Sequence, residues 1–348
     1  MDDWELCVFC LFACCVPVRG ARRSVICDLQ RQVFHFIPNG LYEILTAHRE
    51  KTIKEIKVAC GRQSDEVIDE YFVYLIEQEF GFLSKESENF PLLDLSWQRP
   101  ERITNAIIDI DSRSNHDFDR LFRELDDLGC KALELRFFHR TQSYELGSVL
   151  DLTRGGRLRS ISLVVGWSAE LTPEVIEQLA GDHPRIEGFV VHSAPQSCRQ
   201  ELKPNVVVHY VSEVVDSPKC CGQIHPGYFV TNIHTFTEAQ RYNTCLNRKI
   251  AIDARGDIRN CPSLSKAFGN SRDVSLHSAL ARRDFAQLWE INKDQVEICK
   301  DCEFRYICTD CRAYLSEPGN PYSKPAKCTY DPYAAKWGNT SSNGRGEP

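Results

Sequence analysis

Apolar positions in the first quarter of the chain follow a strand pattern and then a helical one. Runs 24–30 and 32–38 are rich in β-branched and aromatic residues and are expected to pair as strands. Three helices are predicted, over 40–49 with Asn39 as cap, over 52–60, and over 64–80 before Gly81. In the third helix, apolar residues recur at helical spacing and form one face: Val67, Ile68, Tyr71, Phe72, Leu75 and Ile76. This order predicts a winged-helix-like module.

Strands and helices alternate after a polar, proline-containing linker at 86–102. Strands are predicted over 103–111, 131–138, 159–167, 185–194 and 205–211. Helices are predicted over 118–128, over 144–152 and from Thr172, where Pro173 occupies the first helical position. This alternation predicts an α/β fold with a parallel sheet or a partial (β/α) barrel. No dinucleotide-binding or P-loop glycine motif is present.

The pattern changes again near residue 217, where cysteines become frequent. A hairpin is expected over 246–262, with Gly256 supplying its turn, and an amphipathic helix over 276–291. The predicted domains are a winged-helix-like module (1–98), a partial barrel (99–216), a cysteine-rich domain (217–335) and a disordered tail (336–348).

Charge and cysteine content narrow the class of protein. The 348 residues carry a formal net charge of -7, which argues against nucleic acid as a partner because phosphate neutralisation needs a basic face. The apolar run near the N-terminus follows acidic residues and is too short to span a bilayer. We therefore expect a cytoplasmic protein without a membrane partner, in which clustered cysteines among the 17 bind metal rather than form disulfides.

Seven late cysteines have a definite spacing. The pattern begins with C-x10-G-x4-C, continues with C-x2-C-x5-C-x2-C and ends with one more cysteine. Its cysteines are Cys245, Cys261, Cys299, Cys302, Cys308, Cys311 and Cys328. One structural zinc ion needs only four ligands, so seven thiolates, with an eighth upstream, suit two four-thiolate sites better. Zinc and iron–sulfur clusters both accept sulfur ligands, and the spacing alone leaves both open.

This spacing resembles the SPASM domain, which follows the radical SAM domain in many peptide-modifying enzymes and holds two [4Fe–4S] clusters. The chain has two residues, where the usual pattern has three, before the sixth cysteine. The resemblance implies that Cys245, Cys261 and Cys311 bind the first cluster, with Cys221 as fourth ligand. Cys220, His234 or an open iron are alternatives for that position. The second cluster would be bound by Cys299, Cys302, Cys308 and Cys328.

The middle domain lacks the CxxxCxxC motif that binds the radical-generating cluster. This combination resembles the SPASM-domain peptide maturase of the grasp-with-spasm systems, whose members accompany an ATP-grasp ligase and a precursor peptide. SAM cleavage is therefore not expected, and whether the chain is itself an enzyme stays open. Cys7, Cys10 and Cys14 have the reversed spacing CxxCxxxC and either pack as buried thiols or form an unorthodox cluster.

The N-terminal module suits recognition of a leader peptide in such a system. The leader would add a strand along 32–37 and set apolar side chains against the third helix. The expected peptide-binding residues are Gln32, Phe34, Phe36, Tyr71 and Leu75.

The leading hypothesis is an iron–sulfur protein that binds a precursor peptide and assists its maturation by an ATP-grasp ligase. The alternatives are a SAM-dependent or redox peptide modifier and a structural zinc scaffold. No catalytic set is evident. Asp109 and Asp111, at the end of the first barrel strand, are where such a fold keeps its chemistry, although acidic residues there also serve as loop ends.

Overall fold

The computed structural model describes residues 4–203 and 205–338, and the chain divides into two compact units. The first comprises Met1–Trp97, Ile224–Thr244 and Ile291–Pro348, and the second comprises Gln98–Gln223 and Cys245–Glu290. The segment predicted as one cysteine-rich domain therefore contributes residues to both units. Within the predicted tail, Lys336 and Trp337 form a strand, whereas 339–348 lie outside the described residues.

A three-stranded antiparallel sheet forms the centre of the N-terminal module. Its order is β2 (Cys15–Val18), β3 (Ser24–Asp28) and β4 (Val33–Ile37), so β4 is an edge strand. The two predicted strands are confirmed as β3 and β4. A separate antiparallel pair is formed by β1 (Val8–Leu11) and β5 (Gly81–Ser84).

The three predicted helices of this module are present, as α1 (Asn39–Ala47), α2 (Ile53–Ala59) and α3 (Asp65–Glu77). Helix α2 begins with a capping box between Thr52 and Glu55, which pairs two otherwise unbonded backbone N–H groups. The prediction that Asn39 caps α1 is wrong. Pro38 holds that position, and the Asn39 side chain instead bonds the Ser24 hydroxyl at 2.6 Å and the Gly20 carbonyl at 3.2 Å.

The apolar face of α3 is narrower than predicted, because Ile68, Phe72 and Leu75 are buried while Val67 and Ile76 are exposed. The helix ends at Glu77, and Gly81 starts β5 rather than ending the helix. A Cβ atom at Gly81 would lie 2.1 Å from the Cys10 carbonyl oxygen, so the β1–β5 pairing requires glycine there.

The two faces of the three-stranded sheet pack into different cores. Ile26 and Ile37 join one core with buried residues of α1, α2 and α3. Val25 and Cys27 join a second core with Phe304 and Ile307, and Phe34 packs against it. Successive strand residues point to opposite faces, so this division follows from the alternation.

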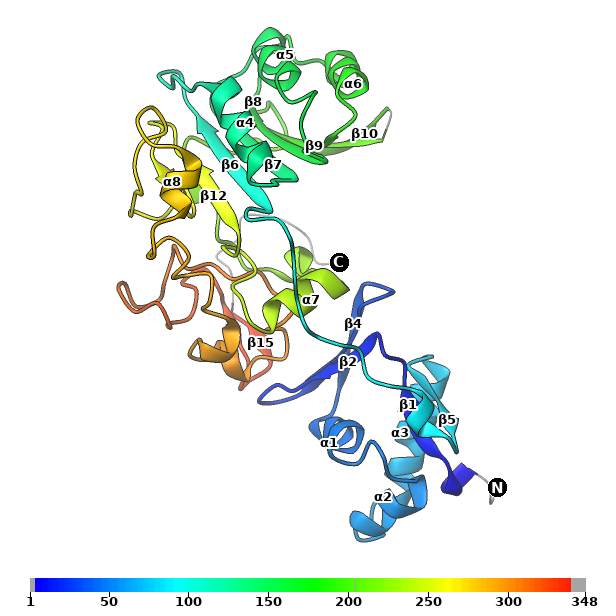
Figure 1. The fold of residues 1–348 in the computed structure, drawn as a ribbon. Coiled ribbons are helices and arrows are strands. Elements are labelled where there is room, and N and C mark those ends of the chain that lie inside the picture. Colours follow the sequence, from blue (N-terminus) through cyan, green and yellow to red (C-terminus); the bar gives the residue numbers. More distant parts are fainter. Residues whose placement is uncertain (1–3, 204, 339–348) are drawn as a thin grey trace. The chain divides into compact units, whose positions relative to one another are not determined.

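The second unit contains a sheet of eight strands, drawn from cyan to yellow in Figure 1. In spatial order they are β10 (Cys198–Leu202), β11 (Val206–Tyr210), β9 (Ile186–His192), β8 (Ser160–Gly166), β7 (Ala132–Arg140), β6 (Asn105–Ile110), β12 (Lys249–Ile252) and β13 (Ile258–Arg259). The central six are parallel and the outer two pair antiparallel. The predicted parallel sheet is confirmed, and β10 is an addition that the sequence pattern did not indicate.

Helices α4 (Phe118–Asp127), α5 (Ser143–Asp151) and α6 (Pro173–Asp182) connect these strands as expected, and they share one hydrophobic core with the sheet. The hairpin of β12 and β13 is confirmed, with Gly256 at φ +90° in its turn.

The long helix expected over 276–291 is wrong. Helix α8 covers only Leu276–Leu280, and the chain then turns so that Phe285 is fully buried with its ring 4.6 Å from Phe268. The helix therefore ends at Leu280, and the turn that follows buries the ring of Phe285 in the core.

The rest of the first unit is mostly irregular. It contains α7 (Ile233–Ala239), β14 (Tyr330–Asp331) and β15 (Lys336–Trp337). Short 3₁₀ helices occur in the two units at Trp4–Leu6, Ser87–Asn89, Pro218–Cys220, Pro226–Tyr228, Lys293–Gln295 and Cys299–Asp301. Within the residues described here, no helix has the length and apolar character needed to cross a bilayer.

Candidate metal centres

One face of the parallel sheet carries charged residues that are buried. Ile108 of β6 and Leu135 of β7 face the helices, so their neighbours Asp109 and Arg136 point to the opposite face. Both are about 1% exposed, and their strands place them directly opposite one another. Lys249 of β12 lies on this same face by the same alternation.

Asp109 and Arg136 form a buried ion pair. Nε of Arg136 donates to Oδ1 of Asp109 at 2.6 Å. Burial raises the pKa of Asp109 from 3.8 to about 6, although the neighbouring guanidinium opposes the rise. The carboxylate of Asp109 and the guanidinium of Arg136 are removed from water, and this hydrogen bond supplies a partner for each.

Cys221 contacts the ion pair of Asp109 and Arg136 through a hydrogen bond. Nη1 of Arg136 donates to the Cys221 sulfur at 2.9 Å. The pKa of Cys221 is lowered to about 6, first by a hydrogen bond from Cys220 and then by Arg136. The thiolate is the form that binds metals. The surroundings therefore favour Cys221 over Cys220, whose pKa is raised, as a ligand.

Cys245 and Cys261 lie around the half-buried Lys249. The Lys249 ammonium is 3.6 Å from the Cys245 sulfur. Burial opposes the charge of Lys249, but attraction to Cys245, Cys261 and other neighbours outweighs it and raises its pKa. Burial raises the pKa of Cys261 to about 11. Three of the four predicted ligands of the first site thus share one charged environment in the second unit, whereas Cys311 belongs to the first unit.

Four cysteines of the predicted second site line one pocket in the first unit: Cys299, Cys302, Cys308 and Cys328. Cys299 begins a 3₁₀ turn, and the Cys302 N–H donates to its carbonyl at 3.0 Å. Phe229, Phe304, Tyr330 and Trp337 complete an aromatic wall around the sulfurs. None of the 17 cysteines of the chain is in a disulfide.

A buried cation accompanies this second set. Lys293 is 5% exposed, and its ammonium donates to the Thr309 carbonyl at 3.2 Å and lies 3.6 Å from Asp310. Burial raises the pKa of Cys308 to about 12, and the charge of Lys293 opposes that rise. Lys293 would therefore compensate part of the negative charge when these thiols ionise.

The donor set fits either a zinc ion or an iron–sulfur cluster by chemistry. Among the described residues, no three of these four sulfurs lie within 4.8 Å of one another. Ligand sulfurs of tetrahedral zinc lie about 3.8 Å apart, so zinc requires them to move together. The pocket that they line measures about 20 Å³, so a four-iron cluster requires its lining side chains to move outward. Metal analysis decides between the two.

The predicted peptide-binding residues do not share one surface. Phe34 and Phe36 lie on the sheet face that meets Phe304, with ring centroids 5.4 and 5.8 Å from it. Tyr71 and Leu75 belong to α3 on the opposite face, where Leu75 is fully buried, and Gln32 is exposed just before β4. The residues of β4 on the α3 side are instead Val33, His35 and Ile37, which the period of two in this strand would have identified.

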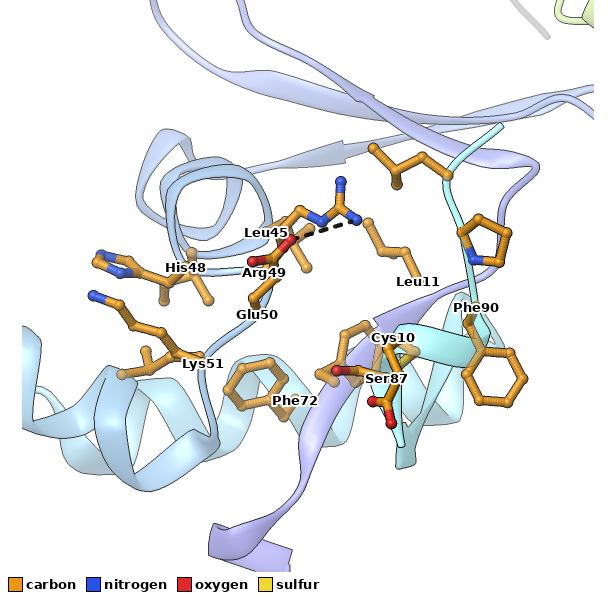
Figure 2. A pocket seen from close by; sticks show the side chains of 16 residues that line it. Cys10, Leu11, Leu45, His48, Arg49, Glu50, Lys51, Phe72, Ser87 and Phe90 are labelled. Carbon is orange, nitrogen blue, oxygen red and sulfur yellow. Dashed lines mark ion pairs between the residues drawn. The ribbon is translucent and has the colours of Figure 1, made fainter. Parts of the chain in front are cut away.

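Among the described residues, the sulfurs of Cys7, Cys10 and Cys14 do not all lie within 4.8 Å of one another. Cys10 lines a cavity of about 430 Å³ between β1, the segment after α1 and residues 87–92. Figure 2 shows Cys10 with Phe72 and Ser87 around this cavity, and the charged side chains of the segment after α1 beside them. Among the described residues, Cys14 instead groups with Cys15 and Asp28.

Two other predicted residues have local roles. Asp111 accepts from the Arg113 N–H at 2.8 Å and from the Ser114 hydroxyl at 3.2 Å, as an acidic residue at a loop end does. His234 lies in the first unit, beside Trp97 and Glu238.

Comparison with known proteins gives a distant structural likeness. No family model and no curated protein matches the chain. Streptococcus suis SuiB bound to S-adenosylmethionine is similar with a TM-score of 0.35 and 11% identity, over 92% of this chain and 97% of that one. SuiB bound to its precursor peptide SuiA is similar with a TM-score of 0.33 and 9% identity, over 91% of this chain and 99% of the other.

Proposed function

We propose that the chain is an iron–sulfur protein that binds a precursor peptide and assists its maturation by an ATP-grasp ligase. The cysteine spacing, which resembles that of a SPASM domain, suggests this role. The observation that carries the proposal is the gathering of Cys299, Cys302, Cys308 and Cys328 in one aromatic-walled pocket of the first unit. A scaffold without metal has no need to line one pocket with four thiols.

In this proposal the four thiolates of that pocket hold one [4Fe–4S] cluster. Lys293 and Asp310 tune the local charge, and the aromatic wall limits access of water. Cys221, Cys245 and Cys261 of the second unit belong to the first cluster, and there Arg136 favours the ionised form of Cys221. When bound, such clusters supply electron transfer or an iron that binds a peptide group.

The peptide would bind at the free edge of β4. An edge strand offers unpaired backbone groups, and strand addition is a common mode of peptide recognition. Val33 is 42% exposed at the start of β4 and lies on the face toward α3. Tyr71 and Tyr74 of α3 are partly buried against the core on that face.

The module and the cysteine pocket belong to one packed structure. Nε of Arg23, before β3, donates to the buried Glu303 at 2.9 Å, and its guanidinium carbon lies 3.5 Å from the centroid of the Phe36 ring. Phe304 lies between Phe34 of β4 and the pocket that contains Cys302. Peptide bound along β4 would therefore lie on the same unit as the proposed second cluster.

The experiment is co-expression of the precursor peptide and the ATP-grasp ligase of the same system, with and without this chain, read by mass spectrometry of the precursor. We expect the modified mass only when the chain is present, and we expect Cys302→Ala to abolish it. Cys60→Ala, at an exposed cysteine of the same unit, is the matched control and should retain it. Identical modification without the chain would overturn the proposal.

A further inference from the structure

A second group of metal-binding side chains lies in the N-terminal module. Cys15 and Asp28 are directly opposite each other in the β2–β3 pair. Neighbouring strand residues would point to opposite faces, but a turn closed by the Cys15 N–H and the Phe12 carbonyl at 2.8 Å precedes β2. The turn brings Cys14 to the side of Cys15. The two sulfurs and a carboxylate oxygen of Asp28 all lie within 4.8 Å of one another.

The surroundings hold these donors in place. Cys15 is 3% and Asp28 2% exposed. Oδ1 of Asp28 accepts from the backbone N–H groups of Gln30 at 3.1 Å and Arg31 at 2.8 Å, which fixes the carboxylate. The Cys14 sulfur lies 3.7 Å from the side-chain oxygen of Gln30. Three metal-binding side chains, two cysteines and one aspartate, thus meet at the beginning of one hairpin.

One cation faces the group. Nη1 of Arg31 lies 3.6 Å from Asp28, but Nη2 of the same guanidinium bonds Glu79 at 2.7 Å. Glu79 therefore offsets the charge of Arg31. Two thiolates and one carboxylate would otherwise leave three negative charges together, of which a divalent cation offsets two.

We propose that Cys14, Cys15 and Asp28 bind one zinc ion. Thiolates exclude Mg²⁺ and Ca²⁺, and zinc accepts the mixed sulfur and carboxylate set in a tetrahedron. Zinc needs its ligand sulfurs about 3.8 Å apart, and the donor atoms of this group all lie within 4.8 Å of one another. The three protein ligands leave a fourth position toward a cavity of about 470 Å³, whose lining includes Gln30 and Glu79, and water takes this position.

This site is independent of the proposed iron–sulfur function, because it uses none of the late cysteines. The ion would join β2 to β3 and would stabilise the folded module, since a ligand that binds only the folded state raises its stability.

The first test is metal analysis of the full chain, reduced and equilibrated anaerobically with zinc alone. We expect Cys14→Ser and Asp28→Asn each to bind about one zinc fewer than the wild type, and Cys60→Ser to bind as much as the wild type. Cys302→Ala separates this site from the late cysteines, because the proposal expects it to retain the zinc at Cys14. Equal zinc in the wild type and Cys14→Ser would overturn the proposal.

The second test needs no variant. Alkylation of the wild type, followed by peptide mass spectrometry, reports the reactivity of each thiol with and without zinc. We expect zinc to slow alkylation of both Cys14 and Cys15 at least tenfold, and to leave Cys60 unchanged. Unchanged rates at Cys14, or a disulfide between Cys14 and Cys15 in the anaerobic protein, would refute the zinc site.

Discussion

At the scale of single residues, the buried charges explain which thiols are suited to bind metal. Arg136 bonds both Asp109 and Cys221, and Lys249 and Lys293 lie beside cysteines in the two units. A cation next to a buried thiol favours its ionised form. The sequence showed the cysteines but not these cations, because β6 and β7 bring Asp109 and Arg136 together only in the folded sheet.

The raised pKa of Asp109 predicts a pH dependence of stability. The folded-state pKa of about 6 exceeds the unfolded value of 3.8. The protonated carboxyl therefore contributes fully to the free energy of unfolding below pH 4, and this contribution is lost as the pH rises to about 6. The loss is on the order of 1–3 kcal/mol. Urea unfolding at pH 4.5 and 6.5 should show a smaller difference for Asp109→Asn than for wild type. Asp111→Asn should retain the wild-type difference in stability between the two pH values. If Asp111→Asn reduced this difference as much as Asp109→Asn, the pH dependence could not be assigned to Asp109.

At the scale of elements, most strands and helices follow from local pattern, and the exceptions have physical reasons. The alternation in β6, β7 and β8 and the helical spacing in α4 predicted those elements. Helix α8 ends early because Phe285 packs against Phe268. The peptide-binding set mixed two faces because Phe34 and Phe36 of β4 contact the C-terminal segment and not α3.

The edge of β4 predicts how a leader peptide responds to substitution. Val33→Lys places a charge at the exposed edge on the side of α3, and we expect the dissociation constant of the leader to rise at least tenfold. Val58→Lys, at an exposed position of α2, is the matched control. Fluorescence titration with labelled leader measures both. Equal affinity of both variants and the wild type would exclude binding along this edge.

At the scale of the whole molecule, segments far apart in sequence form the first unit. The sheet face with Val25 and Cys27 is covered by Phe304 and Ile307, more than 250 residues later. Local patterns predict which residues are apolar but not which distant segment covers them. The sequence therefore suggested an independent module over 1–98, whereas the structure joins it to C-terminal segments.

This shared core predicts a large cost for Phe304→Ala. The ring is 2% exposed and contacts aromatic residues of β4 and of the cysteine pocket. Its loss should cost about 3–5 kcal/mol of unfolding free energy, measured by urea denaturation. Phe90→Ala, at a half-exposed ring of the same unit, should cost much less. Similar costs for the two would show that the shared core contributes little.

The most direct test of the central claim is the iron and sulfide content of the chain after anaerobic reconstitution. We predict about eight irons and about eight sulfides per chain, from two four-thiolate sites. Cys302→Ala should lose about half of both, and Cys60→Ala should lose neither. Zinc without sulfide at the late cysteines, or iron that is unchanged in Cys302→Ala, would contradict the account.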